Sequence, residues 1–191
     1  MSNSVYTTME SLLDSSNPLT DKNTVHSYLP EYEKLLSHKK ESAANILEIG
    51  INQGGSIKLW ADYFTNAQVY GLDVEKTPEW LKVYNRVTTF QQNAYDQNFI
   101  KSHFIDKNIK FDIIIDDGPH TLESMNFAAA NYTKLLTENG IIIIEDIRDW
   151  SWVKIIRQNF PNDINGIINA TDLTRCKNRS DDIFISFQRK T

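Results

Sequence analysis

The chain has 191 residues, of which 40% are hydrophobic and 24% charged, and this composition excludes a disordered or low-complexity protein. The formal net charge of −5 argues against a nucleic-acid partner, because affinity for phosphates depends on clustered Lys and Arg. No apolar run reaches the ~20 residues of a membrane-spanning helix, and no secretory signal is visible. The single cysteine, Cys176, favours a reducing compartment, so we expect a cytoplasmic protein without a membrane partner.

Composition and helix breakers divide the chain into an N-terminal arm or lid over residues 1–30 and a single domain over residues 31–191. The arm is polar and rich in turn formers, whereas the domain alternates helical and extended patterns. In chain order we expect a helix over 31–41, a strand over 45–50, a helix over 56–64, a strand over 68–73, a helical turn over 79–84, a strand over 86–91, a helix over 99–104, a strand over 111–116, a helix over 122–136, a strand over 140–146, a helix over 150–160, and strands over 164–170 and 182–188.

Two of the expected strands contain uninterrupted isoleucine, at Ile113–Ile115 and Ile141–Ile144. Strands that are buried on both faces have this pattern, and they occur in parallel sheets covered by helices on both sides. The short connection between the last two strands indicates a hairpin. The sequence therefore predicts an α/β fold with a doubly wound, mostly parallel seven-stranded sheet and a C-terminal antiparallel hairpin.

Ligands of such sheets bind beyond the carboxyl ends of the strands. After the first expected strand, Gly50 and Gly54 allow the backbone to approach a ligand closely, and Ser56 begins a helix whose free N–H groups suit a carboxylate. Glu48 lies just inside the strand, where an acid needs a partner. The G-x-x-x-G-G spacing matches neither a dinucleotide loop nor a P-loop, and a tight turn without a ligand is the alternative.

The next two strand ends also carry polar side chains. Asp73 ends the second expected strand, where it could accept hydrogen bonds from ribose hydroxyls. Asn93 follows the third, where it could lie near an adenine. Together with the glycine loop they favour an adenosine-containing cofactor, although ordinary polar turns are the alternative.

The strongest signal comes from four carboxylates and an imidazole at two further strand ends. So many like charges need a balancing cation, and hard oxygen ligands suit Mg²⁺ or another hard divalent cation. The alternative is a set of unrelated turns and helix caps. The residues concerned are Asp116, Asp117, His120, Glu145 and Asp146.

At these residues the sequence resembles the class I S-adenosylmethionine-dependent methyltransferases, and more narrowly the macrocin and mycinamicin sugar O-methyltransferases and the cephalosporin-hydroxylase-like proteins. The motifs that carry the resemblance are Thr20-Asp21-Lys22-Asn23 with His26-Ser27-Tyr28, Leu47-Glu48-Ile49-Gly50 with Gly54-Gly55-Ser56, Asp116-Asp117-Gly118-Pro119-His120, and Ile144-Glu145-Asp146.

The resemblance implies a role for each of these residues. S-adenosylmethionine would be bound by the strand-end residues Glu48, Gly50, Gly54, Ser56, Asp73, Asn93 and Asp116. The divalent cation would be bound by Asp117, Glu145 and Asp146. The catalytic pair would be Asp117 and His120, with His120 in the general-base position; in some relatives an acidic residue takes that role instead.

Three residues of the arm, Lys22, His26 and Tyr28, have two interpretations. They could close over the cofactor and the substrate, or they could be surface groups or dimer contacts. A single domain of this size leaves no separate acceptor domain, so the acceptor would be held by the arm, by the strand-end loops or by a partner subunit of a homo-oligomer.

The expected function is therefore O-methylation of a sugar hydroxyl, in a nucleotide-linked sugar or a glycoside. A metal bound to two neighbouring hydroxyls would acidify one of them, and a histidine exchanges protons near neutral pH. A catechol-like or other small diol is an alternative acceptor, since Mg²⁺ chelates any such pair of hydroxyls. A non-catalytic cofactor-binding module is the third alternative, and such a module would have no use for a base and a metal site.

Overall fold

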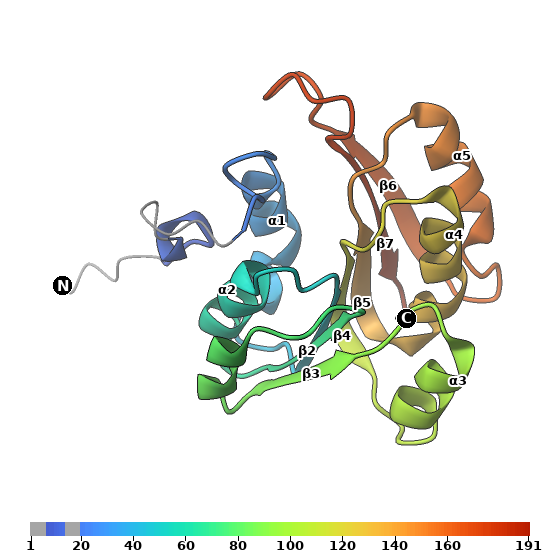
Figure 1. Cartoon of the computed structure of the whole chain (residues 1–191). Helices are drawn as coiled ribbons and strands as arrows, with labels where there is room; N and C mark the ends of the chain where they lie inside the picture. The colour runs from blue at the N-terminus through green and yellow to red at the C-terminus, as the bar shows by residue number, and fades with distance from the viewer. Residues whose placement is uncertain (1–6, 14–19) are drawn as a thin grey trace.

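A seven-stranded sheet forms the centre of the computed structural model, which describes residues 7–13 and 20–191 (Figure 1). The strand order is β3-β2-β1-β4-β5-β7-β6; β1 to β5 are paired in parallel, and β7 runs antiparallel to both of its neighbours. The predicted α/β fold, with its C-terminal antiparallel hairpin, is confirmed. The strands are β1 (Asn45–Ile49), β2 (Gln68–Asp73), β3 (Val87–Gln91), β4 (Phe111–Asp116), β5 (Leu136–Ile144), β6 (Gly166–Asp172) and β7 (Ile183–Arg189).

Helices cover both faces of the sheet, with α1 and α2 on one side and α3, α4 and α5 on the other (Figure 1). None of the helices in the described part of the chain is long and apolar enough to cross a membrane. The α-helices are α1 (Leu29–Leu36), α2 (Gly55–Tyr63), α3 (Gln97–Ile100), α4 (Leu122–Asn131) and α5 (Trp150–Asn159). Shorter helical turns are η1 (Glu10–Leu12), η2 (Ser37–Lys39), η3 (Glu79–Val83), η4 (Lys101–Ile105) and η5 (Tyr132–Leu135).

The isoleucine runs contribute to two hydrophobic cores, one on each face of the sheet. In β4, Ile114 packs into the core beneath α4 and α5, whereas Ile113 and Ile115 pack into the core beneath α1 and α2. All three are fully buried, as the uninterrupted pattern predicts. Side chains alternate across a strand, so a strand buried on both faces needs apolar residues at every position.

The structure differs from the expected elements mainly between α4 and β5. The helix expected over 122–136 ends at Asn131 and is followed by the turn η5, so β5 begins at Leu136 rather than at residue 140. Leu136 pairs with Phe111, and the register then shifts so that Ile141 pairs with Ile113. The first residues of β5, before this shift, show no strand periodicity, so the sequence pattern did not predict them.

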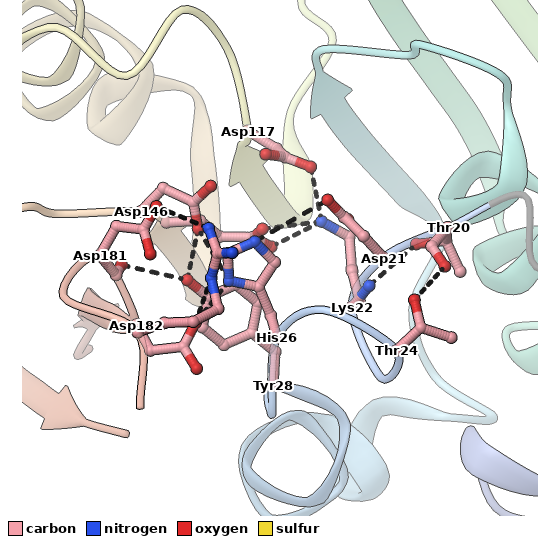
Figure 2. Close-up of polar contacts among 12 residues, drawn as sticks. Thr20, Asp21, Lys22, Thr24, His26, Tyr28, Asp117, Asp146, Asp181 and Asp182 are labelled. Atoms are coloured by element: carbon pink, nitrogen blue, oxygen red, sulfur yellow. Dashed lines mark hydrogen bonds and ion pairs between the residues drawn. The ribbon is translucent and has the colours of Figure 1, made fainter. Parts of the chain in front are cut away.

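The division into an arm and a domain stays a prediction, since residues 1–6 and 14–19 of the arm lie outside the described part of the chain. Residues 20–28, which are described, lead into α1 and lie against the carboxyl ends of β4 and β5 (Figures 1 and 2).

The strand order brings the polar strand ends together. β1 and β4 are neighbours, but the chain continues from β1 toward one edge of the sheet and from β4 toward the other. Ligands of open α/β sheets bind at such a switch point. Ile49 of β1 is paired with Asp116 of β4, which is paired with Ile144 of β5. The residues that follow these three, Gly50, Asp117 and Glu145, therefore leave the sheet side by side.

Candidate functional site

A cavity of about 700 Å³ opens at the carboxyl ends of β1 to β5. Its walls come from the loops that follow β1, β2, β3 and β4, from Asp146 after β5, and from the arm. The arm contributes Thr20, Asp21, Thr24 and Val25. The glycine loop and the acidic strand ends, which the sequence placed at separate strand ends, thus share one cavity.

The loop after β1 requires glycine at two positions. Gly50 has a φ of +89°, and a Cβ there would lie 1.9 Å from the carbonyl oxygen of Asp117. Gly54, with a φ of +86°, is the N-cap of α2, so the helix starts directly beneath the loop. Gly50 and Ser56 line the cavity, which places the first free N–H groups of α2 beside it. An anionic group such as an amino-acid carboxylate suits this position.

Asp73 lines the cavity, but its carboxylate also shapes the loop. Its Oδ2 accepts hydrogen bonds from the N–H groups of Ile51, at 2.7 Å, and Asn52, at 3.0 Å. Asn93 lines the same cavity, and its Oδ1 accepts from the N–H of Tyr95 at 3.0 Å. Both predicted cofactor residues are therefore at the cavity and are held in place by the backbone.

Asp117, His120 and Asp146 form the polar end of the cavity. The His120 Nε2 lies 3.6 Å from Asp117 Oδ1 and 3.6 Å from Asp146 Oδ2. One potential ligand atom from each residue lies within 4.8 Å of the other two. His120 and Asp146 have left-handed backbones, with φ of 52° and 56°, and the other non-glycine residues at positive φ in the described ranges are all asparagines. Strained conformations of this kind cluster at functional sites.

Glu145 is buried beside this trio and binds the arm. Both of its carboxylate oxygens accept from Lys22 Nζ, at 2.9 and 2.7 Å, and one of them also accepts from the Tyr32 hydroxyl. Burial raises the pKa of Glu145 well above its usual value, against the opposing charge of Lys22. Burial alone would lower the pKa of Lys22, but the charges of Asp117, Glu145 and Glu48 outweigh it and hold that pKa well above its usual value.

The arm makes further contacts with the strand ends, and its three predicted residues all point inward (Figure 2). Tyr28 donates a hydrogen bond to Asp146 Oδ1, and His26 Nδ1 shares a hydrogen bond with Asp182, directly before β7. Lys22, His26 and Tyr28 are at most 3% exposed. The interpretation of these residues as surface groups is therefore wrong, because their side chains pack into the domain they belong to. A role in a homo-oligomer stays a prediction.

Two of the predicted cofactor residues lie behind the cavity wall. Glu48 is fully buried and lies 3.6 Å from Lys22. Burial raises the pKa of Glu48 to about 7, against the charge of Lys22. Asp116 accepts from the Tyr95 hydroxyl at 2.6 Å, and burial raises its pKa to about 7.

The predicted residues therefore fall into two groups, and their roles stay predictions. Those at the cavity are Gly50, Ser56, Asp73, Asn93, Asp117, His120 and Asp146. Those outside its lining are Lys22, His26, Tyr28, Glu48, Gly54, Asp116 and Glu145. Sequence reasoning missed Tyr32, Tyr95 and Asp182. Tyr32 was visible only as an apolar position of a helix, and Asp182 only as the first residue of a strand.

The sheet is parallel except for β7, the strand next to its edge. Together with the glycine loop after β1, this arrangement defines the class I methyltransferase fold. Solved structures share this fold: MycE, a methyltransferase of mycinamycin biosynthesis in complex with Mg and SAH, has a TM-score of 0.68 at 19% identity over 87% of this chain and 50% of that one. A putative rRNA-methylase from Clostridium thermocellum has a TM-score of 0.67 at 14% identity, covering 85% of this chain and 96% of that one.

Curated sequences confirm the narrower resemblance to sugar O-methyltransferases. The chain is 26% identical over 149 residues to mycinamicin VI 2''-O-methyltransferase of Micromonospora griseorubida, covering 74% of this chain and 37% of that protein. It is 28% identical over 145 residues to demethylmacrocin O-methyltransferase of Streptomyces fradiae, covering 72% and 36%. The chain thus spans about a third of the curated relatives it matches. No family model matches the chain.

Proposed function

We propose that this protein is an S-adenosylmethionine-dependent, divalent-cation-dependent O-methyltransferase of a sugar hydroxyl. One observation carries the proposal: the glycine loop at the start of α2 and the trio Asp117, His120 and Asp146 line the same cavity. The similarity to sugar O-methyltransferases supports it, and one solved relative was crystallised with Mg, SAH and mycinamycin VI.

The residues present fit both groups that the reaction needs. The N-terminus of α2 beside Gly50 and Ser56 suits the carboxylate of the cofactor, and Asp73 and Asn93 line the part of the cavity beyond it. Asp117 and Asp146 offer hard oxygen atoms, with His120 within reach of both. Two carboxylates suit Mg²⁺ or Mn²⁺ better than a thiolate-binding metal, and they leave the imidazole of His120 free to accept a proton. Glu145, the third predicted ligand, is bound to Lys22 instead.

The chain's own residues would perform three tasks. The loops at the cavity hold the acceptor hydroxyl in line with the methyl group, because alignment supplies much of the rate in a one-step displacement. His120 Nε2 accepts the proton of the acceptor hydroxyl as the new C–O bond forms and the C–S bond of the sulfonium breaks. Asp117 and Asp146, both within 3.6 Å of His120, stabilise the imidazolium that results. A divalent cation at these carboxylates would supply acidification of the bound hydroxyl.

The test is a methyl-transfer assay with S-adenosylmethionine and a panel of nucleotide sugars, glycosides and catechols, read by the mass of one added methylene. Asp117→Asn or excess EDTA should abolish transfer while calorimetry still detects cofactor binding. Full activity in EDTA would remove the cation from the proposal. Absence of S-adenosylmethionine binding would overturn the enzymatic proposal, and methylation of catechols alone would change the acceptor class.

A further inference from the structure

Four carboxylates, those of Glu48, Asp117, Glu145 and Asp146, form an acidic cluster around the side chain of Lys22. Lys22 lies in the arm, 95 residues before Asp117 and 123 before Glu145, and its Nζ lies 2.8 Å from Asp117 Oδ2 and 2.7 Å from Glu145 Oε2. Glu48 Oε1 lies 3.6 Å from the same nitrogen. The Lys22 side chain is 1% exposed, so these carboxylates take the place of its water shell. Figure 2 shows its contact with Asp117.

The arm divides the cluster into an inner and an outer half. Glu48 and Glu145 form the inner half, which faces Lys22. The outer half consists of Asp117 Oδ1, Asp146 Oδ2 and His120 Nε2, which face one another at the cavity.

Asp117 and Asp146 bridge the two halves in the same way. Asp117 Oδ2 accepts a hydrogen bond from Lys22, and Asp146 Oδ1 accepts one from Tyr28. The other oxygen of each carboxylate faces His120. The arm therefore determines which oxygens of the cluster are free to bind a cation.

We propose that Lys22 is a tethered counter-cation that occupies the inner half of the acidic cluster and restricts a divalent cation to the outer half. This inference rests on the proposed function, because it concerns the cation of that same site. It makes Lys22 a positioning residue rather than a substrate contact. Lys22 and the cation then compete for the carboxylate of Asp117, so the charge of Lys22 weakens cation binding.

A second lysine holds the arm without touching the cluster, and it provides a matched control. Lys177, in the connection between β6 and β7, donates hydrogen bonds from its Nζ to the main-chain carbonyls of Asn23, Thr24 and His26. Lys177→Met removes these contacts with the main chain of the arm but leaves Lys22 and its carboxylate partners unchanged. Lys22→Met removes an arm contact and a charge together.

The experiment is a titration of the full-length protein with Mn²⁺, followed by electron paramagnetic resonance of the free ion and by calorimetry. K22M should bind Mn²⁺ about tenfold more tightly than the wild type, because a positive charge next to the site is removed. K22R, which keeps the charge, should stay within about threefold of the wild type. K177M should leave the affinity near that of the wild type if charge, rather than arm position, sets it.

A buried carboxylate left without its partner can prevent folding, so the comparison is repeated in a neutralised background. E145Q is compared with the double variant K22M/E145Q, in which the ion pair is replaced by groups of similar size. Tighter Mn²⁺ binding by the double variant than by E145Q supports the inference. Circular dichroism establishes that each variant is folded.

The results separate this inference from the proposed function. Unchanged or weaker Mn²⁺ binding on removal of Lys22, or an equal gain in K177M, overturns the counter-cation role while leaving the proposed metal dependence intact. Absence of Mn²⁺ binding by the wild type overturns the metal dependence and this inference with it.

Discussion

Asp73, the last residue of β2, binds the loop that follows β1: its Oδ2 accepts hydrogen bonds from the N–H groups of Ile51 and Asn52. Its Oδ1 accepts a third from the N–H of Glu75. A carboxylate with several backbone donors is strongly held, so it fixes the loop before any ligand arrives. The residue that the sequence assigns to ribose recognition therefore also shapes the loop after β1.

Asp73→Ala should speed amide hydrogen exchange at Ile51 and Asn52 in the cofactor-free protein and weaken S-adenosylmethionine binding by about tenfold or more. Exchange measured by NMR and affinity measured by calorimetry report the two effects separately. Asp96→Ala, which removes the N-cap of α3 and does not line the cavity, is the control and should leave the affinity unchanged. Reduced affinity with unchanged exchange would mean that Asp73 acts only by direct contact.

The backbone at His120 predicts an unusual order of stabilities. His120 has a φ of 52°, a left-handed conformation that costs about 1 kcal/mol for a residue with a Cβ and nothing for glycine. Both His120→Gly and His120→Ala should lose methyl transfer, but the glycine variant should be more stable by about that amount in urea unfolding.

The control for this order lies in a regular helix. Lys154 is exposed in the middle of α5, where glycine should instead be the less stable replacement by about 1 kcal/mol. If His120→Gly is less stable than His120→Ala, the left-handed conformation does not describe the protein in solution.

Burial of Glu48 predicts a dependence of stability on pH. Burial raises the pKa of Glu48 to about 7, so the folded protein holds a proton that the unfolded chain has already released above about pH 4.5. The contribution of this group to stability is therefore full below pH 4.5 and is lost as the pH rises through 7. The largest slope for one such group is about 1.4 kcal/mol per pH unit.

Glu48→Gln should therefore make the metal-free protein more stable than the wild type at pH 8, with little gain at pH 5. Urea unfolding at the two pH values measures the difference. Glu75→Gln changes an exposed carboxylate and should shift stability by less than about 0.5 kcal/mol at both. Equal effects of E48Q at pH 5 and pH 8 would show that Glu48 is ionised throughout this range.

The residue pattern predicted the fold and the position of the site, because both depend on local features. Uninterrupted isoleucine in β4 and β5 marks strands buried on both faces, and parallel strands carry their ends to one edge of the sheet. The polar residues at those ends, from Gly50 to Asp146, therefore had to lie together. The pattern could not predict which carboxylate oxygens of these residues remain free to bind a cation.

The partners of Glu145 explain this limit. They are Lys22 and Tyr32, 123 and 113 residues away, and no periodicity connects them to β5. A lysine in a polar arm is ordinarily exposed, and burial among carboxylates depends on a long-range docking that one sequence does not display. Tyr32 fits the apolar face of α1, and its hydroxyl adds no periodic signal.

Arg86 provides a prediction that is independent of the site. Its guanidinium donates to the main-chain carbonyls of Ala61, Phe64 and Ala67, at 2.7, 3.2 and 2.6 Å, and so closes the end of α2 and the turn before β2. Arg86→Met should lower the free energy of unfolding by about 2 kcal/mol, because these carbonyls lose a charged donor. Arg86→Lys should fall between, since an ammonium lacks the planar fork that reaches all three carbonyls.

The control is Lys82→Met, which changes an exposed residue nearby in the sequence and should alter stability by less than about 0.5 kcal/mol. S-adenosylmethionine affinity at a temperature where the variant is folded should stay at the wild-type value, because Arg86 does not line the cavity. Wild-type stability of Arg86→Met would mean that water satisfies these carbonyls as well as the guanidinium does.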